Sequence, residues 1–423
     1  MSAEGVALAG VRERAHERTH EAVRESDMRA FDVIIIGAGL PGLALALALR
    51  GSRLRVALVD RRRPAVEAEA GVEGDAQWDT RVYAISPGNA RFLDAIGVWP
   101  RMDVERLGPI ETMRIFGDRE GAQLDFSAFD SGVRALAWIV EQSELLSATL
   151  SAWADGDPEP IYTDSSPTSL TRESGRQVLG LADGTCLSAR LIVGADGLQS
   201  WTRHQAGIVA ESKSYGHTAV VANFDISGRH HGRAWQWFQP DGGALAWLPL
   251  AGQRLSIVWS APDATASDLM SLDDSAFVEA VTAAGAGAAP AVGTLSLLTP
   301  RASFPLSHIK LPTPIGERIA LVGDAAHGIH PMAGQGLNLG YGDVAALAAA
   351  LDERMPIDDP GDRLVLGRYA RERAFPNAAM SMMTDGLWRL FNTPAAAFAR
   401  NRGMATFDKF PLLKAVVMQP AMR

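Results

Sequence analysis

A glycine-rich turn near the start of the chain has the residue types and the spacing that bind a pyrophosphate. An aliphatic run at 33–36 predicts a buried strand, which leads into Gly37, Gly39 and Gly42 and then an Ala/Leu-rich helix at 43–49. In the pattern Gly-x-Gly-x-x-Gly, the first glycine allows the tight turn, the second lets the phosphates approach the backbone, and the third lets helix and strand pack closely. The helix N-terminus then offers free amides and a favourable dipole to the negative charge.

An acidic residue stands where such a site holds its ribose. A second strand is predicted at 54–59, and it ends at Asp60. A carboxylate about 20 residues beyond the glycines commonly bonds a ribose hydroxyl. The alternative is a glycine turn without a ligand, and the joint presence of strand, turn, helix and acid argues against it. The sequence therefore predicts a dinucleotide site, without choosing between a nicotinamide and a flavin.

Two later segments repeat the pattern of an aliphatic run followed by a glycine turn. They lie at 191–197 and 319–327, and each carries one carboxylate, Asp196 or Asp324, after the run. A doubly wound sheet binds its ligands at the carboxyl ends of its strands, so all three turns are expected at one edge. Together the three segments indicate a flavin site.

These segments resemble the fingerprints of the flavin-dependent aromatic hydroxylases of the para-hydroxybenzoate hydroxylase type. The closest match is the branch that hydroxylates the ring of ubiquinone precursors, and the resemblance covers nearly the whole chain after residue 30. The second fingerprint reads Gly-Ala-Asp-Gly at 194–197, followed by Ser200 and Arg203. The resemblance implies that it serves both flavin and pyridine nucleotide. The third reads Gly-Asp-Ala-Ala-His at 323–327, followed by Pro331 and the run 334–338.

The resemblance implies an α/β fold with a Rossmann-like FAD-binding domain. It implies that Asp324 bonds the ribityl chain and that the backbone at 334–338 lines the flavin ring. The segment 78–86 resembles the family's arginine-bearing stretch, so Arg81 would neutralise pyrophosphate charge; its alternative is a surface arginine. The segment 138–142 resembles the stretch that contacts the ribityl chain through Glu141 or Gln142. The predicted cofactor-binding residues are Gly37, Gly39, Gly42, Asp60, Arg81, Gln142, Asp196, Gly197, Gly323, Asp324, Pro331, Gly334, Gly336, Leu337 and Asn338.

By resemblance, NADPH or NADH reduces FAD, molecular oxygen adds to give a flavin hydroperoxide, and the terminal oxygen passes to an aromatic ring. The implied substrate is a polyprenylated phenol or quinone precursor of ubiquinone. Two alternatives remain: a flavin reductase acting on an isoprenoid, and a flavoprotein that serves mainly in the assembly of a biosynthetic complex. His330 and Pro331 are expected near the flavin. His217, His327 and His330 can assist phenol deprotonation, but no catalytic base follows from sequence alone.

The predicted substrate domain is an antiparallel sheet, because four runs rich in Val, Trp, Phe and Ile lie between 215 and 260 with a turn at 241–243. The aromatic residues there are candidate pocket walls or ordinary core residues; they are Trp235, Trp237, Phe238 and Trp247. Two departures from the family pattern occur. Gly342 precedes Asp343 where an arginine is usual, and Gln236-Trp237 replaces a common Glu-Arg pair.

The composition agrees with a large enzyme. The chain has 423 residues, 47% hydrophobic, and a net charge of −9. It can bury a sizeable core, and its acidic balance argues against nucleic-acid binding. The single cysteine, Cys186, excludes an internal disulfide and is predicted to be a small core residue. The histidine spacing matches no metal-binding template, so no metal is expected.

The domains are predicted to be discontinuous. The division is a charged N-terminal extension at 1–30; the FAD-binding domain at 31–105, 131–210 and 306–360; the substrate domain at 106–130 and 211–305; and a helical C-terminal segment at 361–423. The Pro/Ser/Asp-rich stretch 155–175 is predicted to be an exposed loop.

No apolar run is long enough to cross a bilayer, and residues 1–30 lack the apolar core of a secretory signal. The sequence therefore predicts a cytoplasmic protein. The C-terminal segment carries apolar residues at roughly helical spacing: Met380, Met382, Met383, Leu387, Leu390, Phe391, Phe398, Phe407, Phe410, Leu412, Leu413, Val416, Val417 and Met418. They form a helical cap on the flavin domain, the commoner fate of such a stripe, or a surface for a prenylated lipid, a bilayer or a partner complex.

Overall fold

The computed structural model describes residues 29–65, 78–118, 121–155, 160–239, 241–285, 287–329, 334–391, 393 and 397–407. The predictions for His330, for Pro331 and for most of the segments 1–30 and 65–78 lie outside these residues, as do those for 408–423. The side chain of Phe407 is likewise not described. Within the described residues, none of the helices is both long and apolar enough to span a membrane.

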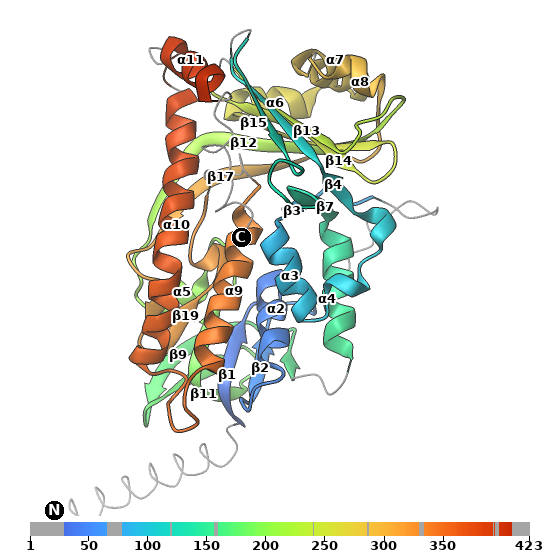
Figure 1. Ribbon diagram of the computed structural model, residues 1–423. Helices are drawn as coiled ribbons and strands as arrows, with labels where there is room; N and C mark the ends of the chain where they lie inside the picture. The colour runs from blue at the N-terminus through green and yellow to red at the C-terminus, as the bar shows by residue number, and fades with distance from the viewer. Residues whose placement is uncertain are drawn as a thin grey trace, which may run out of the picture.

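The lower half of the molecule in Figure 1 is built on a largely parallel sheet with the strand order β18-β19-β11-β1-β2-β8. The central strand β1 pairs in parallel with β2 and β11, and β11 pairs in parallel with β19. A buried Val-Ile-Ile-Ile run occupies β1 at 33–36, as a strand covered on both faces requires. The strands are β1 (Arg29–Ile36), β2 (Val56–Val59), β8 (Ile161–Tyr162), β11 (Cys186–Gly194), β18 (Ile315–Gly316) and β19 (Ile319–Leu321).

The two faces of this sheet are covered differently. Alternate residues of β1 point to opposite sides, so Val33 and Ile35 pack with helices while Ile34 and Ile36 pack with the strand β10. The helices on the first face are α2 (Leu40–Leu49), α4 (Gln142–Ala154), α9 (Gly336–Asp352) and α10 (Arg363–Phe391). The other face is covered by the antiparallel pair β9 (Pro167–Glu173) and β10 (Arg176–Leu181).

The upper half contains a second, mainly antiparallel sheet with the order β16-β12-β15-β14-β13-β5-β6, and β17 pairs with β12. The four strand runs expected between 215 and 260 are β12 to β15. The strands are β5 (Thr112–Phe116), β6 (Gln123–Ser127), β12 (Glu211–Ile226), β13 (Arg233–Phe238), β14 (Ala244–Leu250), β15 (Arg254–Pro262), β16 (Leu295–Leu297) and β17 (Ala302–Lys310). Their outer face packs on α6 (Asp263–Ser271), α7 (Asp274–Ala284) and α8 (Ala289–Val292).

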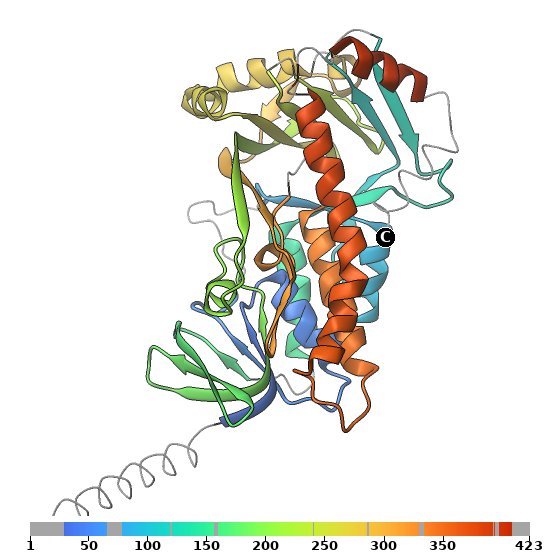
Figure 2. The ribbon, with the colours of Figure 1, turned by 90° about the vertical axis from the view of Figure 1, so that its left-hand side faces the viewer.

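A small sheet and a long helix connect the halves. A small sheet of β3 (Val82–Ile85), β7 (Ala137–Glu141) and β4 (Gly108–Ile110) lies between them, close to α3 (Pro87–Ala95). The helix α10 runs along both halves, as Figures 1 and 2 show, and α11 (Ala397–Phe407) follows at its upper end. The predicted α/β class is confirmed, with a parallel sheet, an antiparallel sheet and a helical C-terminal segment.

Two local predictions are wrong. Cys186 is exposed, because it is the first residue of β11 and lies at the end of the strand outside the packed layers. The stretch 155–175 is not all loop, because β8 and β9 lie within it and β9 pairs with β10 along its length. Its polar composition reflects the solvent-exposed residues of β9.

Candidate active site

The three glycines of the first turn have different surroundings. A Cβ atom at Gly42 would lie 1.9 Å from the carbonyl oxygen of Gly37, and one at Gly37, where φ is +106°, would lie 2.4 Å from the oxygen of Ala195. A Cβ at Gly39 would meet nothing within 4 Å. Gly37 and Gly42 are therefore required by packing, whereas Gly39 leaves open space at the N-terminus of α2.

Asp60 stabilises this turn. It directly follows β2. Its Oδ2 accepts a hydrogen bond from the amide of Ala38 at 2.7 Å, and its Oδ1 accepts one from the amide of Arg62 at 3.0 Å. Asp60 lines the same cavity as Gly39. Its bond to a ribose stays a prediction, and its position beside the open turn supports it.

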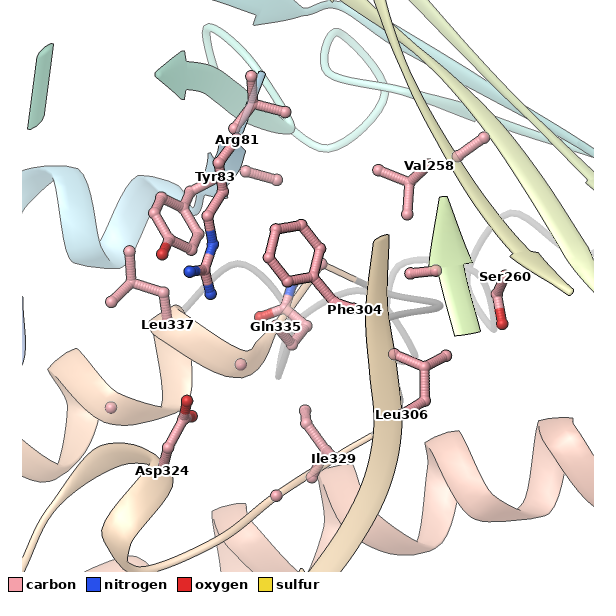
Figure 3. Close-up of a pocket in the computed structure, with 18 of the residues that line it drawn as sticks. Arg81, Tyr83, Val258, Ser260, Phe304, Leu306, Asp324, Ile329, Gln335 and Leu337 are labelled. Carbon is pink, nitrogen blue, oxygen red and sulfur yellow. The ribbon is translucent and has the colours of Figure 1, made fainter. Parts of the chain in front are cut away.

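One cavity of about 1210 Å³ joins the two halves of the molecule. Figure 3 shows Arg81 and Asp324 on one side of it, Val258 and Ser260 on the opposite side, and Phe304 between them. The volume exceeds the roughly 300–1,000 Å³ that is usual for a site holding one small molecule. The cavity therefore has room for part of a cofactor together with a substrate.

Most of the residues that the sequence predicts to bind the cofactor line this cavity. Those that line it are Gly39, Asp60, Arg81, Gln142, Gly197, Gly323, Asp324, Gly334, Gly336 and Leu337. The Tyr83 hydroxyl donates a hydrogen bond to Oε1 of Gln142 at 3.0 Å. The Arg81 guanidinium carbon lies 5.5 Å from the Tyr83 ring centroid and 5.1 Å from that of Phe304, so it points into the cavity rather than to the outer surface.

Asp324 faces the cavity and makes no hydrogen bond to a described residue. Burial by the surrounding protein raises its pKa, although His327 and Arg81 act in the opposite direction. A carboxylate in this position has acceptor capacity to spare for the hydroxyls of a ligand.

Glu141 and Gln142, which the sequence left as alternatives, have separate roles. Glu141 is fully buried, and its carboxylate accepts hydrogen bonds from the amide of Asp79 at 2.6 Å and from Nε of Arg106 at 2.9 Å. Gln142 lines the cavity. Glu141 therefore belongs to the supporting framework.

The Asp196 side chain serves the protein framework. Its carboxylate accepts hydrogen bonds from Ser200 Oγ at 2.5 Å, the amide of Thr202 at 2.9 Å and Thr202 Oγ1 at 3.0 Å. It thereby holds the start of α5 (Trp201–Gln205). Arg203, from the same segment, donates to the carbonyl of Ala325 at 3.0 Å and so ties the second fingerprint to the third.

Asn338 joins the start of α9 to the small sheet. Its Oδ1 accepts from the amide of Ser86 at 2.9 Å, and its Nδ2 donates to the carbonyl of Ala84 at 2.6 Å. These bonds hold the N-terminus of α9, where Gly336 and Leu337 line the cavity. A Cβ at Gly336 would meet nothing within 4 Å. A helix N-terminus opening onto a ligand space favours negative charge there.

A buried charged cluster supports the third fingerprint from below. Asp343 is fully buried, and its Oδ2 accepts from His327 Nε2 at 2.6 Å and from the amide of Gly323 at 3.1 Å. Its Oδ1 accepts from Nε of Arg373 at 2.8 Å. Burial disfavours both charges, but the attraction within the pair wins: the pKa of Asp343 is lowered and that of His327 is raised.

Arg373 is a functional residue that the sequence analysis missed. It comes from α10 and fills the space beside Gly342, where a Cβ would lie 2.7 Å from its Nη2. The arginine that is usual before Asp343 is absent from the sequence, and a guanidinium from a distant helix bonds the aspartate instead. Gly342 was the one feature of the sequence that could have indicated such a contact, because a glycine leaves room for a guanidinium beside Asp343.

The aromatic residues of the second sheet divide between its two faces. Trp235, Trp237 and Trp247 belong to the core under α6 to α8, as ordinary core aromatics. Phe238 lines the cavity and stacks on Phe391 of α10, with ring centroids 3.4 Å apart. The alternation along β13 places every second residue on each side.

The histidines supply no catalytic base on the cavity wall among the residues that the structure describes. His217 accepts a hydrogen bond from Trp388 Nε1 at 3.1 Å, and His327 is committed to Asp343. In the same part of the chain, no group of three or more His, Cys, Asp or Glu side chains has the arrangement of a metal site.

The arrangement fits FAD. The open glycines at both helix N-termini suit a pyrophosphate and a flavin edge, and the carboxylate of Asp324, which faces the cavity, suits a polyol chain. The family described as "FAD binding domain" matches residues 30–384. The chain therefore belongs to this family of flavoproteins, and it is an FAD-dependent monooxygenase of the aromatic hydroxylase type, as the sequence predicted.

Named relatives cover nearly the whole chain. It is 34% identical to ubiquinone hydroxylase UbiL of Rhodospirillum rubrum over 395 residues, which is 92% of this chain and 89% of the relative. It is 31% identical to the 3-demethoxyubiquinol 3-hydroxylase of Escherichia coli, over 92% of this chain and 98% of that one.

Solved structures share the fold. PqsL of Pseudomonas aeruginosa, in complex with 2-aminobenzoylacetate, has a TM-score of 0.72 at 24% identity and covers 89% of this chain and 99% of its own. A variant of HpxO of Klebsiella pneumoniae, complexed with FAD, has a TM-score of 0.71 at 17% identity, with coverages of 92% and 99%.

Proposed function

We propose that this enzyme hydroxylates the aromatic ring of a polyprenylated phenol or quinone precursor in ubiquinone biosynthesis, with NADPH or NADH as reductant. The observation that carries the proposal is the cavity that joins the turn at Gly39 and the carboxylate of Asp324 to the apolar wall of the second sheet. The names of the two relatives above support the substrate class. FAD, when bound, supplies the redox and oxygen chemistry.

The protein's own residues position the reactants and exclude water. Asp324, Gln142 and the N-terminus of α9 would hold the cofactor, and their position on the cavity wall supports this role. Phe304 and Leu306 of β17 present apolar side chains to the cavity. An apolar enclosure of this kind protects a reactive oxidant from water and protons.

A prenyl chain has a path at the far end of the cavity. The wall there is formed by Phe238, Met383, Leu387, Phe391 and Met404, from β13, α10 and α11. Each methylene that stays out of water is worth about 0.8 kcal/mol, so a long chain gains from such a lining. Methionine and leucine side chains adapt to a flexible ligand. This end of the cavity supports a prenylated substrate rather than a bare phenol.

The test is incubation of the FAD-loaded enzyme with NADPH or NADH, labelled molecular oxygen and a short-chain prenylphenol. We expect one labelled oxygen atom in the ring of the product. A reduced product without label would select the alternative of a reductase acting on an isoprenoid. Normal flavin content with neither product would favour the assembly role.

We also propose that α10 contacts an anionic membrane surface. Leu364, Phe375 and Met382 are 77%, 79% and 75% exposed, and their separations of 11 and 7 residues are about three turns and two turns, so they share one helix face. Arg368 and Arg371 are exposed on the same face. Apolar side chains interspersed with arginines are typical of a helix lying at an anionic lipid surface.

Sedimentation with anionic phospholipid vesicles tests this contact. We expect Phe375→Ser to bind the vesicles more weakly than the wild type. Phe129→Ser is the matched control, because Phe129 is 90% exposed on another part of the molecule. Equal binding of both variants and the wild type, or binding that does not depend on the anionic lipid, would refute the proposal.

A further inference from the structure

Gln236 is a buried polar side chain on a largely apolar wall. It is 5% exposed and lines the cavity from β13. The strands β5, β6 and β12 to β15 contribute thirteen described side chains to this wall, and all of them except Gln236 and Ser260 are apolar. The neighbours of Gln236 across the sheet are Ile115 and Ala246.

The amide of Gln236 forms no hydrogen bond with any residue that the structure describes. Its chain neighbours Trp235 and Trp237 point to the opposite face of the sheet, into the core. A ligand that fills the cavity covers this amide, and because burying an amide without a partner costs free energy, the position of Gln236 indicates a polar partner on the ligand. The small side chains of Ala244 and Ala246 leave room for a flat ring beside it.

The charges around the cavity define the ligand further. The cationic side chains that line it, among the described residues, are Arg62, Arg63, Arg81 and Arg400. The first two follow Asp60 at the dinucleotide turn, and Arg81 lies on the flavin side of Phe304. Arg400 forms a buried ion pair with Asp118. The described part of the sheet wall therefore has no free cation to bind a carboxylate.

We propose that the side-chain amide of Gln236 hydrogen-bonds an oxygen substituent on an uncharged substrate ring, and so selects a phenol or quinol over an aromatic carboxylate. The amide both donates and accepts, as a phenolic hydroxyl does, so one residue serves either orientation. An aromatic carboxylate would have to leave water without a guanidinium or ammonium partner.

This inference rests on the proposed function, and the experiment separates the two. Binding of three short-chain prenylated rings to the oxidised FAD-loaded enzyme is followed by the change in flavin absorbance. The rings carry a hydroxyl, a hydrogen, or a hydroxyl with a carboxylate. The variants are Gln236→Met, which keeps the length of the side chain without the amide, and Ile115→Met as a control on the adjacent strand. Labelled oxygen in the product is measured in parallel.

In the wild type we expect the hydroxyl-bearing ring to bind about three- to tenfold more tightly than the ring without it, the range for one neutral hydrogen bond. The carboxylate-bearing ring should bind most weakly. Gln236→Met should lose the preference for the hydroxyl while keeping its FAD, and Ile115→Met should keep the preference.

Two results would overturn the inference: an unchanged preference in Gln236→Met, or tighter binding of the carboxylate-bearing ring by the wild type. If the wild type shows the expected preferences, Gln236→Met loses the preference for the hydroxyl, and no label is inserted, the proposed hydroxylation fails and the role of Gln236 stands. If the wild type inserts label but Gln236→Met keeps the preference for the hydroxyl, the proposed hydroxylation stands and the role of Gln236 fails. A wild type that binds none of the rings refutes both.

Discussion

Substitutions at the glycines of the first turn distinguish two roles: Gly39 is needed for ligand binding, whereas Gly42 is needed for the packing of the fold. Gly39 and Gly42 are three positions apart, yet a Cβ at Gly39 meets no protein atom within 4 Å and one at Gly42 lies 1.9 Å from the Gly37 carbonyl oxygen. The backbone of Gly39, with φ −75° and ψ −177°, is open to any residue. Each glycine is replaced by alanine.

The two variants should fail in different ways. In Gly42→Ala, the methyl group forces α2 away from the turn, and overpacking of this kind costs about 1–3 kcal/mol of unfolding free energy. In Gly39→Ala, the free energy of unfolding should stay within about 1 kcal/mol of the wild type or rise slightly, because alanine restricts the unfolded chain. Its methyl group enters the space left for the pyrophosphate. Loss of one charged hydrogen bond is worth about 1.5–3 kcal/mol, which weakens FAD binding roughly 10- to 150-fold.

The assays are urea unfolding of the apoproteins and titration of each with FAD. The reasoning predicts a stable Gly39→Ala variant with weak FAD binding, and a destabilised Gly42→Ala variant. A Gly39→Ala variant that binds FAD as the wild type does would place the phosphates elsewhere. Equal destabilisation of both apoproteins would show that Gly39 is a packing glycine as well.

Three further predictions concern single residues. Asp324→Ala should weaken FAD binding by about 10- to 150-fold. Because burial raises the pKa of Asp324, its contribution to the stability of the apoprotein is present below about pH 4 and is lost as the pH rises through the raised pKa. In a pH series of urea melts, the variant should therefore lose less stability over that rise in pH than the wild type does. Arg373→Ala leaves the buried Asp343 without its guanidinium partner and should lower the free energy of unfolding in urea by about 3–5 kcal/mol. Arg371→Ala, at an exposed position, should change the free energy of unfolding by less than about 0.5 kcal/mol. Equal effects of the two substitutions would contradict the place of Arg373 in the buried cluster. Cys186, being exposed, should react with a thiol reagent in the native protein, and protection until unfolding would contradict its place in β11.

Short-range sequence patterns determined the first elements of the half that is built on the parallel sheet. The run 33–36, the glycine turn and the helix after it are encoded by neighbouring residues, so the sequence predicted β1, the turn and α2 in order. The functional distinction among the glycines was also predicted in part, since the pattern assigns close packing to Gly42 and ligand approach to Gly39. The surroundings of each Cβ in the structure agree with that assignment.

The choice between adjacent residues depended on which side of an element each one occupies. Glu141 ends β7 and turns toward Arg106, while Gln142 begins α4 and faces the cavity. In the same way, Trp237 of β13 points into the core and its neighbour Phe238 points into the cavity. Sequence periodicity predicts that neighbours in a strand alternate, but which set faces the cavity depends on the sheet that the strand joins.

Contacts between distant segments were decided by the tertiary structure alone. Arg373 reaches Asp343 because α10 packs against α9, and no local pattern at 373 distinguishes it from Arg371. Gln236 becomes a candidate recognition residue because strands far apart in the sequence surround it with apolar side chains. The sequence by itself determined the cofactor class and the elements that hold it, since each of the three glycine turns is encoded by neighbouring residues and the three together indicate a flavin. The partners of buried charges and the polarity of the cavity wall depend on how the elements pack, which only the folded chain specifies.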